Sequence, residues 1–417
     1  MNETNETRTD EKNDKPKLLI ATTVPQTIRA FLLPYADHFR GRGWRVDALA
    51  REAASAQALE GHFDNIYDAP WDRSPLSPGN LPALSQIARL VQEGGYDIVH
   101  VHTPVAAFVT RAALRKLRAT EGSKHPKIVY TAHGFHFYRG GSWRRNLVFR
   151  NLEKTAGKWT DRLIVINRED FEAAKTYRIV PADKGDQLVY MPGIGLDFSK
   201  YDGEDISRED ILAVRTELGL KDDDVLYSML AEFNPGKRHK DVIAALSKTK
   251  NPQIHVAFAG DGPLKQKIQE MARAYTVHQR THFLGHLKNP NALMAASRAT
   301  LVPSEREGLS RSAMESACLG VPIIGTDARG VRDVIEPHRG LLYPAGDQLA
   351  LRDAMLRMFE EPYPPVEPDS AWRIESLIDM HEALYQELLE SEKEEEPQQE
   401  TVQDTNDEKT EEEKADA

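Results

Sequence analysis

Residues 303–315 read Pro-Ser-Glu-Arg-Glu-Gly-Leu-Ser-Arg-Ser-Ala-Met-Glu, and the fold and function that we expect rest on this stretch. It follows an apolar run at 299–302 that predicts a strand, and it leads into a pattern that predicts a helix. Gly308 stands at the turn between them, so Glu307 lies in a loop and Glu315 inside the helix. Strand, turn and helix in this order indicate a unit of a parallel sheet.

The first turn of the predicted helix indicates an anion site. Amide groups there lack intrahelical partners and carry a partial positive charge, so Leu309, Ser310 and Arg311 can receive a diphosphate. The carboxylates of Glu307 and Glu315 are better suited to accept hydrogen bonds from hydroxyls, which a sugar and a ribose present. The alternative is a solvated helix face with two unrelated glutamates. The strand and glycine before it favour a nucleotide-sugar site.

At these residues the chain resembles the retaining glycosyltransferases of family 4, whose signature is two glutamates with seven residues between them. The resemblance continues through 320–335, Gly-Val-Pro-Ile-Ile-Gly-Thr-Asp-Ala-Arg-Gly-Val-Arg-Asp-Val-Ile. Gly330 matches the second glycine of a glycine pair in the family, and Arg329 stands in place of the first. Asp333 stands where the family has a glutamate. The resemblance covers roughly residues 17–390. It implies the GT-B fold, an α/β architecture of two Rossmann-like domains whose parallel sheets face an interdomain cleft.

Short apolar runs alternate with amphipathic stretches, which predicts βαβ units in two series. The predicted strands are 17–22, 45–50, 98–102, 128–131 and 163–167, and then, after a break at 192–202, 226–231, 255–260, 282–284, 299–303 and 322–326. We expect an N-terminal acceptor-side domain at 17–200 and a C-terminal nucleotide-sugar-binding domain at 201–368. The helix expected within 369–390 crosses back to the first domain, as the GT-B resemblance implies.

The net charge of −11 is a property of the ends of the chain. Residues 391–417 hold twelve acidic residues and three lysines, and residues 1–16 hold five acidic and three basic residues. The body between them is near neutral, so we predict no nucleic-acid partner. Both ends lack apolar periodicity and are expected to be disordered. The acidic end is either a solubility tail or a docking segment for another protein.

Two loops of the second series resemble donor-binding loops of the family. The segment 231–240, Ala-Glu-Phe-Asn-Pro-Gly-Lys-Arg-His-Lys, places Lys237 where the family binds the diphosphate. Glu232 stands where the family has an arginine, and Arg238 or Arg311 could replace that charge. The alternative is that both arginines are ordinary surface residues. Gly260 and Gly262 resemble a turn that lets the backbone approach the nucleotide sugar.

A histidine of the first series is the expected catalytic residue. Residues 130–137 read Tyr-Thr-Ala-His-Gly-Phe-His-Phe and follow a predicted strand, where open α/β sheets bind ligands. The resemblance implies that His133 contacts the donor sugar at the reacting centre, together with Glu307. His136 is the competitor, and its simpler role is packing in a cluster with Phe135 and Phe137.

The stretch 139–159 predicts a basic helix with large apolar groups. Its cations are Arg144, Arg145, Arg150, Lys154 and Lys158, and its apolar residues are Trp143, Leu147, Val148, Phe149, Leu152 and Trp159. This composition favours contact with an anionic membrane surface. The alternative is a helix that packs on the core with a solvated basic side. The stretches 100–104, 134–137, 151–153, 161–167 and 191–195 resemble enzymes of capsule, exopolysaccharide and lipopolysaccharide assembly. This resemblance implies a polyprenyl-linked saccharide acceptor.

The sequence offers little sign of a metal or cofactor, and we predict neither. Asp222 and Asp224 form an Asp-x-Asp in a polar turn, and His100 with His102 share one face of a strand without further ligands. No apolar run approaches the 18 residues that span a bilayer, and the N-terminus lacks the apolar segment of a signal peptide. We therefore expect a cytoplasmic protein, peripheral on the inner face of the plasma membrane.

Together these features predict a retaining glycosyltransferase that moves a sugar, with UDP as the expected nucleotide, to a lipid-linked saccharide. Two alternatives share the fold. A nucleotide-sugar epimerase would consume the sugar nucleotide without an acceptor. A noncatalytic scaffolding subunit would fit the loss of the arginine at Glu232.

Overall fold

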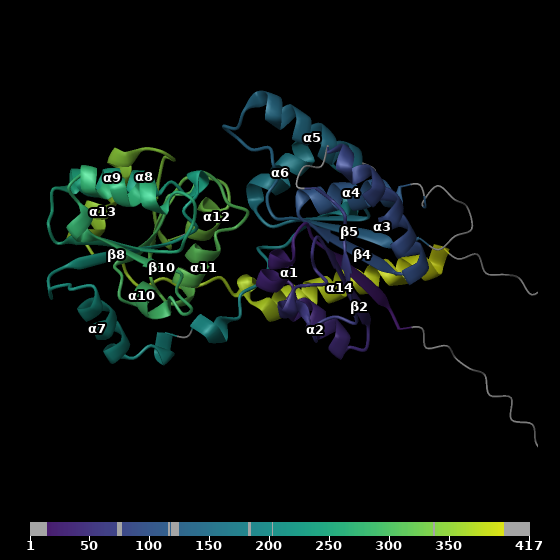
Figure 1. The fold of residues 1–417 in the computed structure, drawn as a ribbon, viewed down its shortest axis with the longest axis horizontal. Helices are drawn as coiled ribbons and strands as arrows, with labels where there is room; N and C mark the ends of the chain where they lie inside the picture. Colours follow the sequence, from purple (N-terminus) through teal and green to yellow (C-terminus); the bar gives the residue numbers. More distant parts are fainter. Residues whose placement is uncertain are drawn as a thin grey trace, which may run out of the picture.

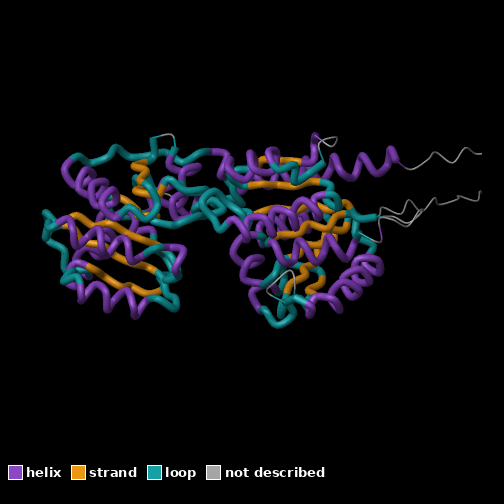
Figure 2. The backbone as a smooth tube through the Cα atoms, turned by 90° about the horizontal axis from the view of Figure 1, so that it is seen from above, coloured by secondary structure: helices purple, strands orange, loops and turns teal. Residues whose placement is uncertain are grey.

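The computed structural model describes residues 15–395 except 73–76, 116, 118–124, 182–184, 202 and 337. Within them the chain forms two α/β domains, each built on one parallel sheet (Figure 1). Seen from above, helices lie on both sides of the strands in each domain (Figure 2). This is the predicted architecture of two Rossmann-like domains. The expected tails lie outside the described residues at 1–14 and 396–417.

The N-terminal sheet has seven parallel strands in the order β3-β2-β1-β4-β5-β6-β7. The order reverses between β1 and β4, where Leu18 pairs with Ile98. At such a point the loops diverge and leave room for a ligand at the carboxyl edge. The strands are β1 (Lys17–Ala21), β2 (Arg45–Ala50), β3 (Asn65–Asp68), β4 (Ile98–His102), β5 (Lys127–Ala132), β6 (Arg162–Val165) and β7 (Leu188–Tyr190).

The helices of this domain pack their apolar faces onto the sheet. In α3, Ala83, Ile87 and Val91 recur every four residues and are buried, and Gly95 ends the helix in a left-handed conformation. The helices are α1 (Pro25–Phe31), α2 (Leu33–Gly41), α3 (Leu81–Gly94), α4 (Pro104–Leu114), α5 (Trp143–Gly157) and α6 (Arg168–Thr176).

The C-terminal sheet has six parallel strands in the order β10-β9-β8-β11-β12-β13, so its order reverses between β8 and β11. Its strands are β8 (Val225–Leu230), β9 (Ile254–Ala259), β10 (Thr281–Gly285), β11 (Ala299–Val302), β12 (Ile323–Thr326) and β13 (Gly340–Tyr343). Its helices are α7 (Arg208–Glu217), α8 (His239–Thr249), α9 (Lys265–Ala274), α10 (Asn291–Ala295), α11 (Arg311–Cys318), α12 (Arg332–Ile335) and α13 (Gln348–Glu360).

Burial explains which strands the sequence predicts. The central strand β4 is buried at every residue, and its bounds are the predicted ones. The sequence does not predict β3, β7 or β13, which lie at sheet edges and are mostly half-exposed. An edge strand is covered on fewer sides, so it needs no continuous apolar run.

The last helix, α14 (Ile374–Glu395), leaves the C-terminal domain and returns to the N-terminal one (yellow in Figure 1). Its Leu377, Tyr385 and Leu388 belong to the buried cluster around β1 and α2. The helix continues to Glu395, beyond the boundary expected at residue 390. Residues 391–395 thus extend α14 into the acidic end of the chain, since glutamate and lysine extend an existing helix at little cost.

Candidate active site

Two loops from different domains meet at the carboxyl edges of the sheets. One follows β5 and carries His133, and the other follows β11 and carries Glu307 and Gly308. The loops are so close that a Cβ atom on Gly308 would lie 2.1 Å from the carbonyl oxygen of His133. Glycine is therefore required at 308 for the two domains to approach, which is a stronger constraint than the turn that the sequence indicates.

A cavity of about 240 Å³ lies between the domains beside these loops. Four of the predicted site residues border it, and they come from both domains: His133, Gly308, Leu309 and Arg311. Phe31, at the end of α1 in the N-terminal domain, also borders the cavity. Its ring stacks on that of His133, with the ring centroids 6.4 Å apart. A pocket that joins an imidazole to the start of a helix can hold an anionic ligand beside a hydrogen-bonding group.

The imidazole of His133 is fixed by a second histidine. Its Nε2 lies 3.0 Å from Nδ1 of His102, the last residue of β4. Burial lowers the pKa of His133 to about 4, with a smaller contribution from His381. The ring is therefore neutral near pH 7 and can exchange hydrogen bonds with a sugar without carrying charge.

A buried layer of polar side chains supports this pair. The ring of His100 lies tilted against that of His102, with centroids 4.1 Å apart, and its two nitrogens contact the Tyr385 hydroxyl and, at 2.7 Å, the Thr131 hydroxyl. Burial lowers the pKa of His100 and of His102 well below the usual range, so both are neutral. The sequence shows only that His100 and His102 share a strand face. Their link to Tyr385 depends on the return of α14.

His136 points to a different environment. Its ring packs at 4.9 Å against Phe149 of α5, while Phe135 and Phe137 stack on each other at 4.8 Å. Packing remains the simpler role for His136, and the ring that it contacts belongs to α5. Alternating residues of this loop face opposite sides, so His136 is separated from its two phenylalanine neighbours.

Lys237 and Glu307 form an ion pair. The lysine Nζ lies 2.5 Å from Oε1 of Glu307, and both side chains are partly exposed. Lys237 ends a short 3₁₀ turn (Pro235–Lys237), where its amide donates to the side chain of Asn234. From the sequence we expect Lys237 to bind the diphosphate and Glu307 to bind hydroxyls of the sugar. Without a ligand they neutralise each other.

Glu315 is held by two side chains from either side. Its Oε1 accepts a 2.6 Å hydrogen bond from the hydroxyl of Tyr201 and a 2.8 Å bond from Nε of Arg311. Arg311 also donates to the carbonyl oxygen of Ala30 in the N-terminal domain, at 3.0 Å. No described residue donates to Oε2 of Glu315, which leaves that oxygen for a hydroxyl. Tyr201 carries no sequence signal that could reveal this role.

One predicted amide and two predicted glycines make contacts within the C-terminal domain. The amide of Ser310 donates to the carbonyl oxygen of Gly330, so it is already used. Gly260 and Gly262 both have positive φ, and a Cβ atom on either would lie within 2.1 to 2.7 Å of the backbone at 231–233. These glycines therefore let two loops of the C-terminal domain pack together.

Neither arginine proposed to replace the charge at Glu232 is free. Arg238 contacts Asp241 at 2.5 Å and Glu305 at 3.2 Å, which makes it part of the local structure. Arg311 is held by Glu315. Glu232 itself accepts a hydrogen bond from Asn234 at the surface.

Arg329 links the two domains. Its Nη1 lies 2.9 Å from Oδ1 of Asp170 at the start of α6, and also donates to the carbonyl oxygens of Phe135 and Phe137. Its Nε donates to the carbonyl oxygen of Glu307, at 3.2 Å. One buried guanidinium thus contacts both the loop after His133 and the loop that carries Glu307. The sequence shows Arg329 only as a departure from the family's glycine.

Asp333, the second departure, also reaches the N-terminal domain. Its Oδ1 accepts a 2.8 Å hydrogen bond from the amide of Arg168, and its Oδ2 accepts one from the amide of Gly330. A Cβ atom on Gly330 would lie 2.4 Å from the carbonyl oxygen of Gly308. Residues 329–333 therefore form a contact surface between the domains, packed against the loop that carries Glu307 and Gly308.

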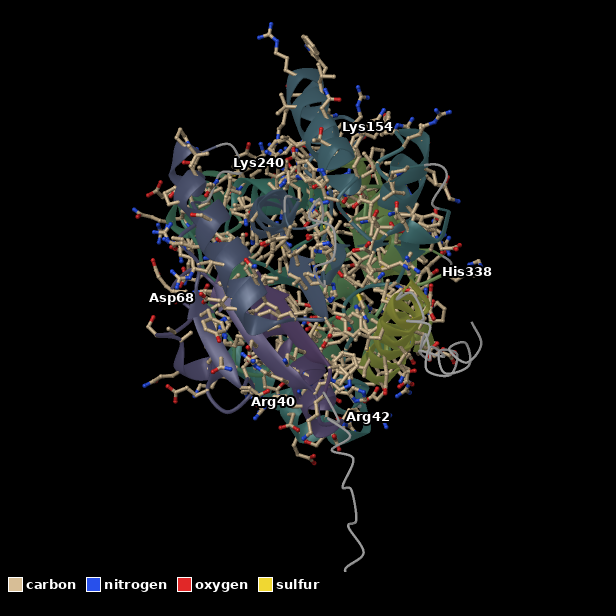
Figure 3. All side chains as sticks on the ribbon, turned by 90° about the vertical axis from the view of Figure 1, so that its right-hand side faces the viewer. Arg40, Arg42, Asp68, Lys154, Lys240 and His338 are labelled. Atoms are coloured by element: carbon tan, nitrogen blue, oxygen red, sulfur yellow. The ribbon has the colours of Figure 1, made fainter. Side chains whose placement is uncertain are left out.

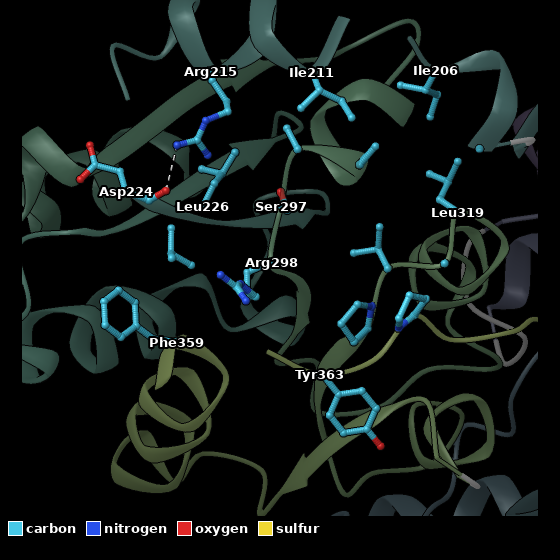
Figure 4. A pocket seen from close by; sticks show the side chains of 18 of the residues that line it. Ile206, Ile211, Arg215, Asp224, Leu226, Ser297, Arg298, Leu319, Phe359 and Tyr363 are labelled. Carbon is cyan, nitrogen blue, oxygen red and sulfur yellow. Dashed lines mark hydrogen bonds between the residues drawn. The ribbon is translucent and has the colours of Figure 1, made fainter. Parts of the chain in front are cut away.

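A larger cavity of about 910 Å³ lies at the amino-terminal edge of the C-terminal sheet (Figure 4). Asp222 and Asp224 line it, and Arg215 donates to the backbone oxygen of Asp224 at 3.0 Å. None of the predicted site residues borders this cavity. The Asp-x-Asp thus lies at the edge of the sheet opposite to Lys237.

Two further searches concern metals and membranes. In the part of the chain that the structure describes, no three His, Cys, Asp or Glu side chains converge in a way that could hold a metal ion. No described helix combines the length and the apolar character needed to cross a bilayer.

Comparison with known proteins identifies relatives over most of the chain. Residues 31–185 match the family described as Glycosyltransferase Family 4, and residues 210–374 match Glycosyl transferases group 1. The chain is 32% identical over 350 residues to the protein named as glycosyltransferase EpsD of Bacillus subtilis (strain 168), a match that covers 83% of this chain and 88% of that protein.

The name of a second relative states its donor and acceptor. The UDP-Gal:alpha-D-GlcNAc-diphosphoundecaprenol alpha-1,3-galactosyltransferase of Escherichia coli is 25% identical over 288 residues, which cover 68% of this chain and 71% of that enzyme.

A solved structure supports the fold. HepE of Anabaena in complex with UDP and glucose matches with a TM-score of 0.68 and 19% identity, over 91% of this chain and 100% of that chain. At this identity the likeness concerns architecture alone, and it agrees with the two sheets described above. The identity to EpsD over most of both chains establishes the relationship. The chain therefore belongs to the family 4 glycosyltransferases with the GT-B fold, among the enzymes of polysaccharide biosynthesis.

Proposed function

We propose that the protein transfers a sugar from a UDP-sugar to a saccharide on a polyprenyl diphosphate, with retention of configuration at the anomeric carbon. The observation that carries the proposal is the interdomain cavity bordered by His133 and by the residues that open α11. The solved HepE complex contains UDP and glucose, and the name of the E. coli relative specifies a diphosphoundecaprenol acceptor. These relatives favour neither an epimerase nor a noncatalytic subunit.

The arrangement of charges supports roles for the predicted residues. Lys237 and the amides of Leu309 and Arg311 would stabilise the charge that develops on the departing diphosphate. A diphosphate would compete with Glu307 for Lys237, and the released carboxylate could then accept bonds from the sugar hydroxyls. In this proposal Glu315 binds the ribose, and the leaving phosphate takes up the proton of the acceptor hydroxyl on the same face.

UDP binding tests the donor site. Replacing Lys237 or Glu315 with alanine is expected to weaken UDP binding by roughly 1.5 to 3 kcal/mol, or about ten- to a hundredfold, because each change removes a hydrogen bond to a charged group. The dissociation constants should be measured by titration calorimetry on the full chain.

Lys240 provides the control for this titration. Lys240, which is labelled in Figure 3, is exposed on α8 and lies three residues beyond Lys237. Lys240→Ala should therefore leave UDP affinity unchanged. If the Lys237 and Glu315 variants both bind UDP as the parent does, the donor site has been assigned to the wrong residues.

We further propose that α5 contacts an anionic membrane surface from the cytoplasmic side. The helix projects from the body of the N-terminal domain (Figures 1 and 3). Trp143, Leu147 and Val148 on it are 70%, 41% and 45% exposed, which is unusual for large apolar side chains. Its one acidic residue, Glu153, is buried against Arg111. The outward face therefore combines exposed apolar groups with cations that form no ion pair with any residue that the structure describes.

Charge reversal on this face is expected to release the protein from vesicles. Changing Arg144, Lys154 and Lys158 to glutamate should remove at least about 3 kcal/mol of binding to vesicles that contain anionic lipid, since each basic residue contributes about 1 kcal/mol near such a surface. Co-sedimentation measures the bound fraction.

A matched triple variant separates location from net charge. Arg42, Lys240 and Lys267 are exposed and lie on other elements, so changing them to glutamate alters the net charge equally. This control should remain bound. Equal release of both triple variants would contradict a specific contact through α5.

A further inference from the structure

Three arginines surround the segment that follows His133. The guanidinium of Arg306 lies 4.8 Å from the ring centroid of Tyr138, and that of Arg329 lies 5.7 Å from the same ring. Arg145 of α5 lies 5.6 Å from the ring of Phe149, which in turn packs on His136. We call Arg145, Arg306 and Arg329 the arginine cluster. It brings cations from both domains to one place.

The charge of this cluster is only partly compensated. Asp170 neutralises Arg329 at 2.9 Å. Among the described residues, no carboxylate forms an ion pair with Arg145 or Arg306, and neither guanidinium donates a hydrogen bond. Arg306 is nevertheless half-buried, where an unpaired charge is costly. Two unpaired guanidinium groups beside a third indicate a place that an anion would stabilise.

Neighbouring groups respond to the excess of positive charge. The pKa of His136 is lowered to about 4, mainly by burial and then by the positive charges of Arg306, Arg145 and Arg329. Burial also lowers the pKa of Arg306. Tyr138 opposes this shift, the nearby charges of Arg329 and Arg145 add to it, and the carboxylate of Glu305 opposes it more weakly. The Nδ1 atom of His136 is buried and has no hydrogen-bond partner among the described residues. An imidazole nitrogen without a partner is a second group that a ligand could satisfy.

We propose that Arg145 and Arg306, with His136, bind the diphosphate of the lipid-linked acceptor. This inference rests on the proposed function, because it assigns the acceptor's phosphates to a place that the donor residues do not occupy. Arg145 and His136 belong to the N-terminal domain, whereas Lys237 and Glu315 belong to the C-terminal one. Arg306 also belongs to the C-terminal domain and directly precedes Glu307, but its guanidinium packs on Tyr138 of the N-terminal domain.

The position of α5 favours the acceptor over the donor. Asn146, in the first turn of α5, exchanges hydrogen bonds with the backbone of Tyr138, at 2.8 Å through its Nδ2 and 3.3 Å through its Oδ1. The exposed face of α5 and the arginine cluster are therefore fixed to each other. A carrier whose chain lies in the membrane would present its phosphates close to the surface, on the side where Arg145 is placed. Tyr138 also borders a cavity of about 340 Å³ between α5 and α6, but Glu169, Asp170 and Glu172 line that cavity and none of the three arginines borders it. We therefore place the diphosphate at the arginine cluster and not in that cavity.

The test uses farnesyl diphosphate as the probe and farnesol as its phosphate-free control. Both are titrated by calorimetry into the full-length protein, without UDP and with saturating UDP. The parent should bind farnesyl diphosphate, and not farnesol, also when UDP fills the donor site. Arg145→Ala and Arg306→Ala should each weaken this binding roughly ten- to a hundredfold, with UDP affinity unchanged. Arg144→Ala, one residue away on α5, should bind the probe as the parent does.

Three results would overturn the assignment. One is parental affinity for farnesyl diphosphate in both the Arg145 and the Arg306 variants. Another is competition between UDP and the probe, or weaker UDP binding by Arg306→Ala, which would give the cluster to the donor's diphosphate. The third is loss of probe affinity by Arg144→Ala to the same extent. A parent that fails to bind UDP yet binds the probe through these arginines would overturn the proposed function and leave this site standing.

Discussion

Arg329→Ala is expected to lower the free energy of unfolding by about 3 to 5 kcal/mol, because it leaves a buried carboxylate without its partner. The side chains of Arg329 and Asp170 are 4% and 2% exposed. The same substitution removes donors from the carbonyl oxygens of Phe135 and Phe137. Urea denaturation of the variant and the parent, followed by circular dichroism, measures the difference.

An exposed pair on the same segment serves as the control. Arg332 contacts Asp327, and their side chains are 36% and 50% exposed, so Arg332→Ala should cost at most about 1 kcal/mol. If Arg329→Ala costs no more than Arg332→Ala, the contact does not hold the domains together. Burial already raises the pKa of Asp170, and Arg329 opposes this rise. In the variant the carboxyl group would protonate more readily in the folded state, so the loss of stability should be smaller at acidic pH.

A double variant distinguishes the effect of the uncompensated charge on Asp170 from the effect of losing the hydrogen bonds of Arg329. Asp170→Asn combined with Arg329→Met removes both charges while it keeps side chains of similar size. Replacing a buried ion pair as a whole is often nearly neutral, whereas breaking it is costly. Recovery of much of the lost stability in the double variant would assign the effect to the uncompensated charge of Asp170. No recovery would assign it to the hydrogen bonds that Arg329 donates to the loop after His133.

The parts of the fold that sequence predicts are those with a local physical signature. β4 is buried at every residue and carries three aliphatic side chains among its five, and its predicted bounds agree with the structure. The strand, glycine and helix around Glu307 are equally local, since a turn and a helix start leave marks within a few residues. Edge strands such as β13 leave weaker marks, because half-exposed residues need no apolar run.

The contacts that shape the site are distant in sequence. Arg329 and Asp170 are 159 positions apart, and Tyr201 and Glu315 are 114 apart. No periodicity or spacing connects such residues, because their proximity depends on how the two domains and α14 pack. His102 illustrates the same limit, since a buried strand histidine has the same local pattern whether or not it holds a second histidine. Departures from a family pattern, such as Arg329, are the sequence signal that could direct attention to these positions.

His133→Ala is expected to lower turnover roughly 100- to 1000-fold while UDP affinity stays near the parental value. The ring borders the interdomain cavity and is neutral, so its contribution should be a hydrogen bond to the sugar as charge develops at the reacting centre. Losing one such preorganised group typically costs two to three orders of magnitude in turnover. Turnover is measured with a UDP-sugar and a lipid-linked saccharide, and UDP affinity by calorimetry.

A second histidine pair in the same chain provides a matched control. Nε2 of His282 on β10 lies 3.2 Å from Nδ1 of His255 on β9, much as Nε2 of His133 lies 3.0 Å from Nδ1 of His102. Neither His282 nor His255 borders the interdomain cavity. His282→Ala removes a histidine of a similar pair, so any loss of stability should be comparable while turnover remains near the parental value. If His133→Ala retains turnover at the level of His282→Ala, the imidazole has only a packing role. Its hydrogen bond to His102 would then serve the fold, and the group that assists transfer would have to come from another loop of the cavity.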